Sequence, residues 1–120
     1  MQEILEHLMH HVNQIRLFHW KTSSFARHKA TDKYMKIINP IIDNIIESLQ
    51  GGRGKRISDA FGTKYRELTE DNVMEHLKVY RYWLENHMPI LLDKSETDIL
   101  NLRDELLAAV KRLMYLFTLK

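Results

Sequence analysis

The sequence predicts an all-α protein of four long helices, and two observations lead to this prediction. Apolar residues recur at intervals of three and four along most of the chain, which is the spacing of one helix face. Turn residues are scarce: the 120 residues include four glycines and two prolines, and three of the glycines lie together in GGRG. Long periodic segments with few joints indicate one helical domain over residues 1–120.

The first two helices are predicted from the N-terminal half. The first reaches from the N-terminus to about His19, where KTSS breaks the apolar spacing and supplies two serines, either of which can cap the next helix. The second covers about residues 28–50 and carries a broad isoleucine-rich face. Pro40 lies inside it, so we expect one lost hydrogen bond and a kink there.

The last two helices are predicted from the C-terminal half. Residues 73–84 carry the helical spacing, and Pro89 stops the helix that contains them. The spacing resumes over residues 99–117, and the preceding SETD (95–98) resembles a capping box.

The connections between the helices are unequal in length. The first and last joints take roughly seven and eight residues, whereas about nineteen residues, 51–69, separate the second helix from the third. Such a connector reaches about 60 Å when extended and can therefore pass along a helix of about 33 Å. One long crossover between helices two and three predicts a ferritin-like four-helix bundle. Within the connector, DAFGTKYREL (59–68) is expected to form a short helix.

Composition excludes several classes of function. The net charge of +2 is too balanced to argue for nucleic-acid binding by itself, and the lack of cysteine excludes disulfides, thiolate zinc sites and a thiol nucleophile. No long uncharged apolar stretch predicts a membrane span, so we expect a cytoplasmic protein without a membrane partner. GGRGKR does not match a phosphate-binding loop, because the required first glycine and final serine or threonine are missing.

A second, polar stripe lies on the predicted helix over residues 28–50. Counting about 100° per residue from His28, the other members lie within about 100° of it: Asp32, Asn39, Asp43 and Glu47. The apolar residues of the same helix fall mostly between about 180° and about 320°. The helix therefore presents ligand-type side chains on the face opposite its core face.

This stripe contains two pairs with i, i+4 spacing, His28/Asp32 and Asp43/Glu47, and each pair is close enough to hold one ion. The pairs lie about 16 Å apart along the axis, so they cannot share an ion within one chain. They are placed symmetrically about the helix centre. An antiparallel second copy would therefore set each pair opposite the other and create two identical intersubunit sites.

His19, at the end of the first helix, could supply a further nitrogen to such a site. Imidazole and carboxylate ligands without thiolate suit iron or manganese, and zinc also fits. The same pairs are common on solvent-exposed helix faces, so the alternative is that these side chains are solvated and bind no metal.

The residues of this region resemble the ferroxidase signature of the Dps family, the mini-ferritins that protect DNA during starvation. The resemblance rests on spacing and on the aromatic residues around the ligands, and it is carried by His19, Trp20, Phe25, His28, Asp32, Tyr34, Asp43 and Glu47. It covers about residues 18–47, and the four-helix layout extends it over the chain.

The resemblance implies a dodecameric shell that oxidises ferrous iron, preferably with hydrogen peroxide, and stores the ferric product. One subunit would supply His19, His28 and Asp32 to each site, and its two-fold mate would supply Asp43 and Glu47. Trp20 would lie beside the site and intercept stray oxidising equivalents.

The chain also differs from the family. The loop between His19 and His28 is shorter, Ser48 follows Glu47 where arginine is common, and no lysine-rich tail precedes the first helix. The alternative is therefore a catalytically silent helical assembly or interaction protein, with or without DNA binding. His10 and His11 are interpreted as surface or interface residues.

Overall fold

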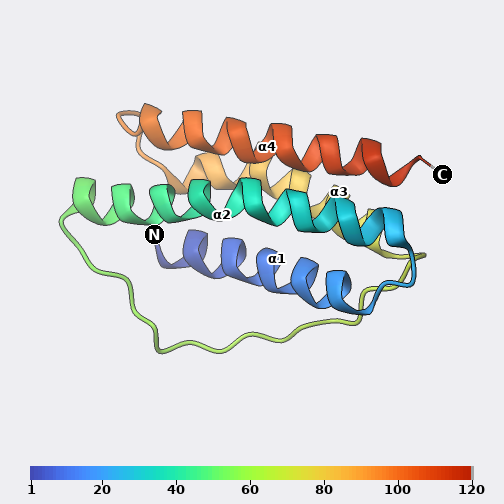
Figure 1. Ribbon diagram of the computed structural model, residues 1–120. Coiled ribbons are helices and arrows are strands. Elements are labelled where there is room, and N and C mark those ends of the chain that lie inside the picture. Colours follow the sequence, from blue (N-terminus) through green and yellow to red (C-terminus); the bar gives the residue numbers. More distant parts are fainter. Residues whose placement is uncertain (120) are drawn as a thin grey trace.

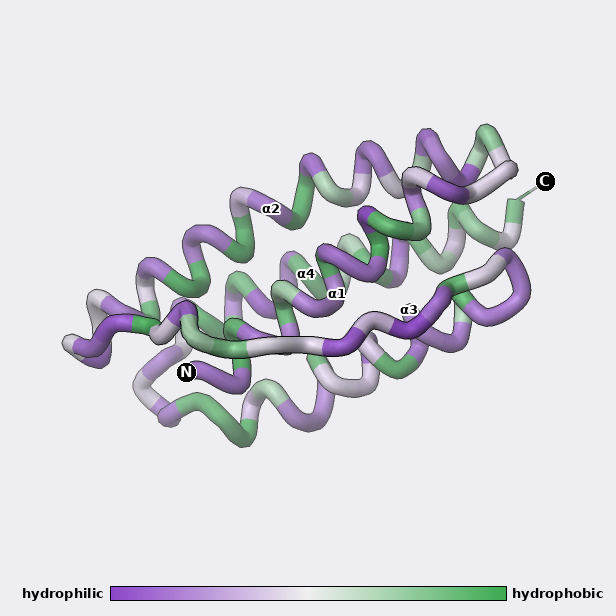
Figure 2. The backbone as a smooth tube through the Cα atoms, turned by 90° about the horizontal axis from the view of Figure 1, so that it is seen from below, coloured by the Kyte–Doolittle hydropathy of each residue, from purple (hydrophilic) through white to green (hydrophobic). Residues whose placement is uncertain are grey.

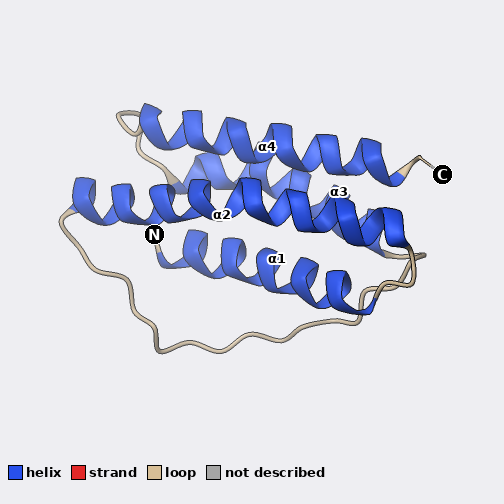
Figure 3. Ribbon diagram, in the orientation of Figure 1, coloured by secondary structure: helices blue, strands red, loops and turns tan. Residues whose placement is uncertain are grey.

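The structure, a computed structural model, describes residues 1–119, which form four α-helices and no β-strand (Figures 1 and 3). The predicted all-α class is therefore confirmed for these residues. The elements in chain order are α1 (Gln2–Lys21), α2 (Phe25–Arg53), α3 (Val73–Tyr82), the π-helical turn η1 (Trp83–His87), the 3-10 turn η2 (Met88–Leu91) and α4 (Thr97–Phe117). Helix α1 runs antiparallel to α2, α3 runs in the same direction as α2, and α4 returns in the opposite direction (Figure 1).

The helices pack because each one buries its apolar face against the others. Hydrophobic and hydrophilic residues alternate along each helix in step with the helical turn (Figure 2). Helix α2 packs against both α1 and α4. The largest fully buried side chains come from all four α-helices, the connector and both short turns: Phe18, Ile4, Leu8, Ile15, Ile38, Ile45, Leu49, Leu68, Leu77, Leu84, Met88 and Ile99.

Helix α2 is longer than the predicted segment 28–50 at both ends. The prediction of a serine cap is confirmed, because Oγ of Ser24 accepts a hydrogen bond of 3.2 Å from the backbone N–H of Arg27. The helix continues through Pro40 and ends at Gly54, whose φ of 65° is the left-handed conformation that glycine adopts most readily. The ligand-type stripe of α2 therefore lies on one uninterrupted helix.

The connector between α2 and α3, residues 54–72, runs along α1 for most of its length (Figure 2). The prediction of a short helix within residues 59–68 is wrong, since this segment is extended and irregular. Side chains of α1 form hydrogen bonds with backbone N–H and C=O groups of the connector. Gln14 donates to the backbone carbonyl of Arg66 at 2.9 Å and accepts from its N–H at 2.8 Å, and Gln2 pairs in the same way with Ser58.

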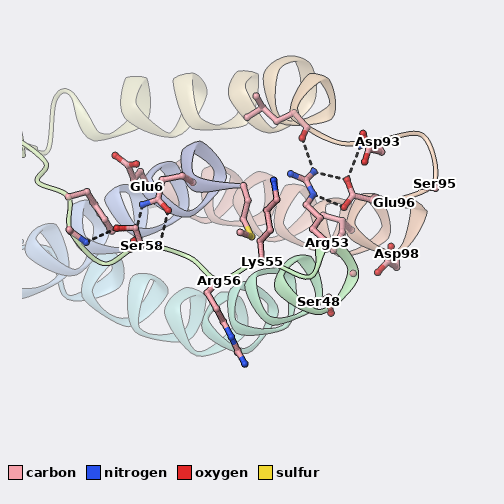
Figure 4. Close-up of a pocket in the computed structure, with 17 residues that line it drawn as sticks. Glu6, Ser48, Arg53, Lys55, Arg56, Ser58, Asp93, Ser95, Glu96 and Asp98 are labelled. Carbon is pink, nitrogen blue, oxygen red and sulfur yellow. Dashed lines mark hydrogen bonds and ion pairs between the residues drawn. The ribbon is translucent and has the colours of Figure 1, made fainter.

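The start of α4 also differs from the prediction. The capping box over residues 95–98 does not form: Glu96 is the N-cap, and its side chain makes no capping bond. Its carboxylate instead accepts two hydrogen bonds from Arg53, from Nε at 2.9 Å and from Nη2 at 2.7 Å (Figure 4). Arg53 also donates to the carbonyl of Leu91 at 3.0 Å. This ion pair joins the C-terminus of α2 to the start of α4, and the guanidinium lowers the pKa of Glu96.

The interpretation of His11 as a surface residue is wrong. Its side chain is 1% exposed and lies between α1, α2 and α3. The imidazole is satisfied by Tyr34 from α2 at 2.7 Å and by His76 from α3 at 3.1 Å. Because both ring nitrogens have partners, a polar ring can be buried at this position without a large penalty.

Candidate metal centre

The corner between α1 and α2 brings two histidines together. Only three residues, 22–24, separate the helices. This is a tighter joint than the predicted seven residues. The rings of His19 and His28 stack with their centroids 4.0 Å apart and an angle of 13° between their planes. His19 is 9% exposed, whereas His28 is exposed to solvent. The short loop therefore holds both imidazoles at one corner, with His28 on the outer side.

Backbone geometry orients the His28 ring. Its Nδ1 lies 3.0 Å from the carbonyl oxygen of His19, in the last turn of α1. A carbonyl can only accept a hydrogen bond, so Nδ1 of His28 carries the proton and donates. The last carbonyls of a helix lack partners within that helix, which makes them available to such a side chain. Nε2 of His28 is then left with its lone pair, the form that binds metal ions.

Thr31 orients the His19 ring in the same way. Nδ1 of His19 lies 2.8 Å from Oγ1 of Thr31, a fully buried residue. The hydroxyl of Thr31 has two carbonyl acceptors within reach, those of Arg27 at 2.8 Å and His28 at 3.1 Å, so it donates to the backbone and its oxygen accepts from His19. Nδ1 of His19 therefore also carries the proton, and Nε2 keeps its lone pair. Metal-binding histidines are commonly held by such a hydrogen bond to their other nitrogen.

Asp32 lies one helical turn after His28 on α2, and its carboxylate is paired with Lys36. Its pKa is lowered, first by a hydrogen bond from Lys36 and then by the positive charge of the same lysine. Oδ2 of Asp32 is 3.1 Å from Nζ of Lys36. The carboxylate is thus ionised and close to the histidines, but its present partner is Lys36. A metal ion at this corner would have to displace that lysine.

Asp43 and Glu47 lie elsewhere on the same helix. Both are exposed, and both line a groove of about 320 Å³ between α1 and α2. The other walls of the groove are largely apolar and come from Leu5, Met9, Val12, Asn13, Asn39, Ile42 and Ile46. Asp43 lies about 16 Å along α2 from Asp32 and about 22 Å from His28, so one chain does not bring the two ligand groups together.

Trp20 follows His19 directly but points away from the protein. Its side chain is 68% exposed, and Phe25 at the start of α2 is 74% exposed. Both side chains are therefore accessible to a ligand or to another chain. The corner therefore presents two oriented imidazole rings together with two solvent-exposed aromatic side chains.

Among residues 1–119, no group of three or more His, Asp or Glu side chains is positioned to hold a metal ion. The corner itself offers two imidazole nitrogens with free lone pairs, while the carboxylate of Asp32, one helical turn away, is paired with Lys36. Fe(II), Mn(II) and Zn(II) all bind imidazole and carboxylate ligands, but the groups at this corner alone leave coordination positions empty.

Sequence reasoning missed two residues that shape this corner. Lys36 was detectable, because a lysine four positions after an aspartate on a helix commonly pairs with it. Thr31 was not detectable from helix periodicity, since its partner His19 belongs to another helix, twelve residues away in the chain. The contact exists only because the joint of residues 22–24 folds α2 back onto α1.

Comparison with known proteins places the chain in a wider group. Residues 19–117 match a protein family described as a family of unknown function (DUF5856). No curated protein and no solved structure matches the chain. No helix within residues 1–119 is long and apolar enough to cross a membrane.

Proposed function

The chain belongs to DUF5856, a family of unknown function, and from its histidine corner we propose that it binds and oxidises ferrous iron as a Dps-like mini-ferritin. The observation that carries the proposal is the orientation of His19 and His28. Each ring has Nδ1 fixed by a hydrogen bond and Nε2 free, beside the ionised Asp32. Iron is the substrate of this reaction, and its ferric product is the stored material.

The path of the chain supports a ferritin-like four-helix bundle. Helices α1 and α2 form an antiparallel pair, the connector of residues 54–72 crosses the length of the molecule, and α3 then runs parallel to α2 (Figure 1). One long crossover between the second and third helices is the connection of ferritin-like bundles. Proteins of this architecture bind metal ions with carboxylates and histidines on facing helices.

The missing ligands are proposed to come from a second copy of the chain. His28 and Asp32 lie toward one end of the exposed α2 face, and Asp43 and Glu47 lie toward the other. An antiparallel copy packed along α2 would bring the carboxylate pair of one chain to the histidine corner of the other, twice per dimer. The carboxylates would offset the positive charge of bound iron and complete the ligand set, which one chain alone does not provide.

The residues have distinct tasks in this proposal. His19 and His28 each hold one iron ion of a dinuclear site through Nε2, because two stacked rings cannot direct their lone pairs at the same ion. Asp32 releases Lys36 and binds the metal instead. Asp43 and Glu47 of the second copy close the site. Two Fe(II) ions supply the two electrons that reduce one hydrogen peroxide, with two protons, to two waters. Trp20 is exposed beside the corner and can donate an electron to a stray oxidant.

The decisive experiment mixes two inactive variants. A chain with His28→Ala keeps its carboxylates, and a chain with Asp43→Ala keeps its histidine corner. Each variant alone should oxidise Fe(II) with peroxide no faster than buffer, as followed by stopped-flow absorbance. After the two are unfolded and refolded together, each mixed dimer contains one intact site, so about a quarter of the parent sites should return.

A matched control and a contrary result define the test. Glu105→Ala removes an exposed carboxylate from α4 and should leave oxidation unchanged. Failure of the mixture to regain activity, when mass measurement shows mixed dimers, would exclude a site shared between two chains. Oxidation by the His28→Ala variant at the parent rate would exclude the site altogether.

One observation favours a second candidate, a helical assembly or interaction protein without metal chemistry. Asp32 is already paired with Lys36, and residues 1–119 contain no three-ligand cluster. Failure of Fe(II), Mn(II) and Zn(II) to bind the assembled parent protein in titration calorimetry would exclude the metal site and favour this second candidate. A dodecameric shell and an association with DNA are further proposals, tested by native mass and by gel shift at low salt.

A further inference from the structure

A buried tyrosine and two histidines form a continuous hydrogen-bonded line from the protein interior toward its surface. The hydroxyl of Tyr34 lies 2.7 Å from Nε2 of His11, and Nδ1 of His11 lies 3.1 Å from Nε2 of His76. Tyr34 is 3% exposed and His11 is 1% exposed, whereas His76 is only partly buried. The three residues come from α2, α1 and α3, so the line exists only in the folded chain.

The direction of each hydrogen bond follows from the partners available. The Tyr34 hydroxyl has His11 as its partner among residues 1–119. If it accepted from His11, its own hydrogen would be buried without an acceptor, which is costly. The hydroxyl therefore donates to Nε2 of His11. Nδ1 of His11 then carries a proton and donates to Nε2 of His76.

Both histidines are neutral in this arrangement and able to accept a proton. Burial lowers the pKa of His11 well below its usual range, and burial together with His10 and Arg66 lowers the pKa of His76 to about 4. A neutral imidazole that donates at one nitrogen and accepts at the other can pass a proton along the line.

We propose that Tyr34 is a redox-active tyrosine whose phenolic proton leaves through His11 and His76 when the ring is oxidised. A one-electron oxidant, the class that includes the hydroxyl radical and ruthenium(III) polypyridyl complexes, takes one electron from the phenol. The O–H bond of Tyr34 breaks as an N–H bond forms at Nε2 of His11. The Nδ1 proton of His11 moves to Nε2 of His76, which releases a proton to solvent. Tyr34 is left as a neutral phenoxyl radical, and reduction reverses each step.

The physical reason is that protons and electrons travel differently. An electron can tunnel through several layers of protein, but a proton moves only between atoms in hydrogen-bond contact. An oxidised phenol is a strong acid, so a buried tyrosine loses an electron readily only when a proton acceptor is within about 2.6–3.2 Å of its oxygen. The Tyr34–His11 distance of 2.7 Å meets that condition.

Tyr80 provides a natural control in the same core. Its ring stacks on His11, with centroids 3.5 Å apart and 1° between the planes, and it is 6% exposed. Its hydroxyl, however, has no hydrogen-bond partner among residues 1–119. Tyr34 and Tyr80 are thus two buried phenols beside one imidazole, and only Tyr34 can transfer its proton.

The experiment uses the metal-free full chain, so it does not depend on the proposed iron site. The three exposed tyrosines are first replaced (Tyr65→Phe, Tyr82→Phe and Tyr115→Phe), which leaves only the two buried ones. Photogenerated ruthenium(III) tris(bipyridine) is the oxidant, and the phenoxyl radical is followed by transient absorption and electron paramagnetic resonance. Circular dichroism melts check that each variant is folded.

The expected result separates Tyr34 from Tyr80. The phenoxyl signal should persist in Tyr80→Phe and disappear in Tyr34→Phe. Its formation should slow in D₂O and slow at least tenfold in His11→Gln, because the acceptor nitrogen is lost. If His11→Gln does not fold, His76→Gln tests the second transfer by the same slowing.

Two results would overturn the proposal. One is a phenoxyl signal that survives in folded Tyr34→Phe and is lost in Tyr80→Phe. The other is a Tyr34 radical that forms at the same rate in H₂O, in D₂O and in the folded histidine variants. A merely structural role for the line would lower the melting temperature of the variants without assigning the radical to Tyr34.

Discussion

Oγ1 of Thr31 lies 2.8 Å from Nδ1 of His19, and both side chains are buried between α1 and α2. The hydroxyl accepts from the imidazole while it donates to the carbonyl of Arg27. One threonine therefore determines which nitrogen of His19 is free and holds the ring in place.

Replacing Thr31 with valine should weaken metal binding at the corner. Valine has nearly the same shape but cannot accept a hydrogen bond, so His19 loses both its orientation and its fixed tautomer. We expect the affinity for Zn(II) or Mn(II) to fall about 10–100-fold, the usual effect of losing such a partner. Isothermal titration calorimetry measures it, with Thr31→Ser as the control that retains the hydroxyl. Equal affinities for Thr31→Val and the parent would contradict the role of Thr31 in orienting His19 for metal binding.

Removing Lys36 should have the opposite effect. Its ammonium group is the present partner of Asp32, 3.1 Å away, and it competes with a metal ion for the same carboxylate. In Lys36→Ala the carboxylate is free, and we expect metal affinity to rise about twofold, the scale of an exposed i, i+4 pair. Lys29→Ala removes an exposed lysine from the same helix and serves as the charge control. A weaker affinity in Lys36→Ala than in Lys29→Ala would contradict this role.

An arginine at position 39 should prevent the proposed pairing of two chains. Asn39 lines the groove between α1 and α2 beside Asp43, near the centre of the polar face of α2. In an antiparallel dimer the two copies of Asn39→Arg would bring like charges together across the two-fold axis. We expect weaker self-association by analytical ultracentrifugation and loss of tight iron binding, with an unchanged helical circular dichroism spectrum. If association and affinity both match the parent, the antiparallel model is wrong.

The buried histidines should make the fold less stable in acid. For His76 the usual pKa is 6.5 and the folded pKa is about 4, so between these values the unfolded chain binds more protons than the folded chain. Stability is therefore complete above about pH 6.5 and falls as the pH drops toward 4. In His76→Gln this slope should decrease by up to about 1.4 kcal/mol per pH unit. Urea unfolding at several pH values measures the slope, and parallel curves for parent and variant would refute the prediction.

The ion pair between Arg53 and Glu96 should stabilise the end of the molecule where α2 and α4 meet. Both side chains are largely buried, and Arg53 also binds the carbonyl of Leu91 (Figure 4). Arg53→Met keeps the aliphatic stem and removes the charge, which should lower the free energy of unfolding by about 1–3 kcal/mol.

Its pH dependence provides a check on that cause. The pKa of Glu96 is lowered in the folded chain by Arg53, so the contribution is present above the usual value of 4.5 and lost as the pH falls through the folded pKa. The difference in stability between parent and Arg53→Met should therefore shrink below about pH 4.5. A difference that stays constant into acid would mean that packing, rather than charge, causes the loss.

Much of the fold could be predicted from residues close together in the chain. Apolar spacing of three and four marked all four helices, and the serine after α1 marked the start of α2 through its capping bond. The ligand-type stripe of α2 was equally readable, because side chains four residues apart lie on one helix face whatever surrounds the helix. The capping box at residues 95–98 does not form, because α4 takes Glu96 rather than Ser95 as its N-cap, and Glu96 pairs with Arg53, which is far away in sequence.

Tertiary structure decided the rest, namely which polar side chains meet across different elements. The pattern on α1 does not show that His11 is buried or that Gln14 holds the connector through Arg66. It also does not show that His19 would be oriented by Thr31. The sequence by itself determined the helices and the positions of the ligand-type residues, since both depend on local geometry. Only folding decided the protonation, orientation and burial of those residues, since these depend on contacts between segments distant in the chain.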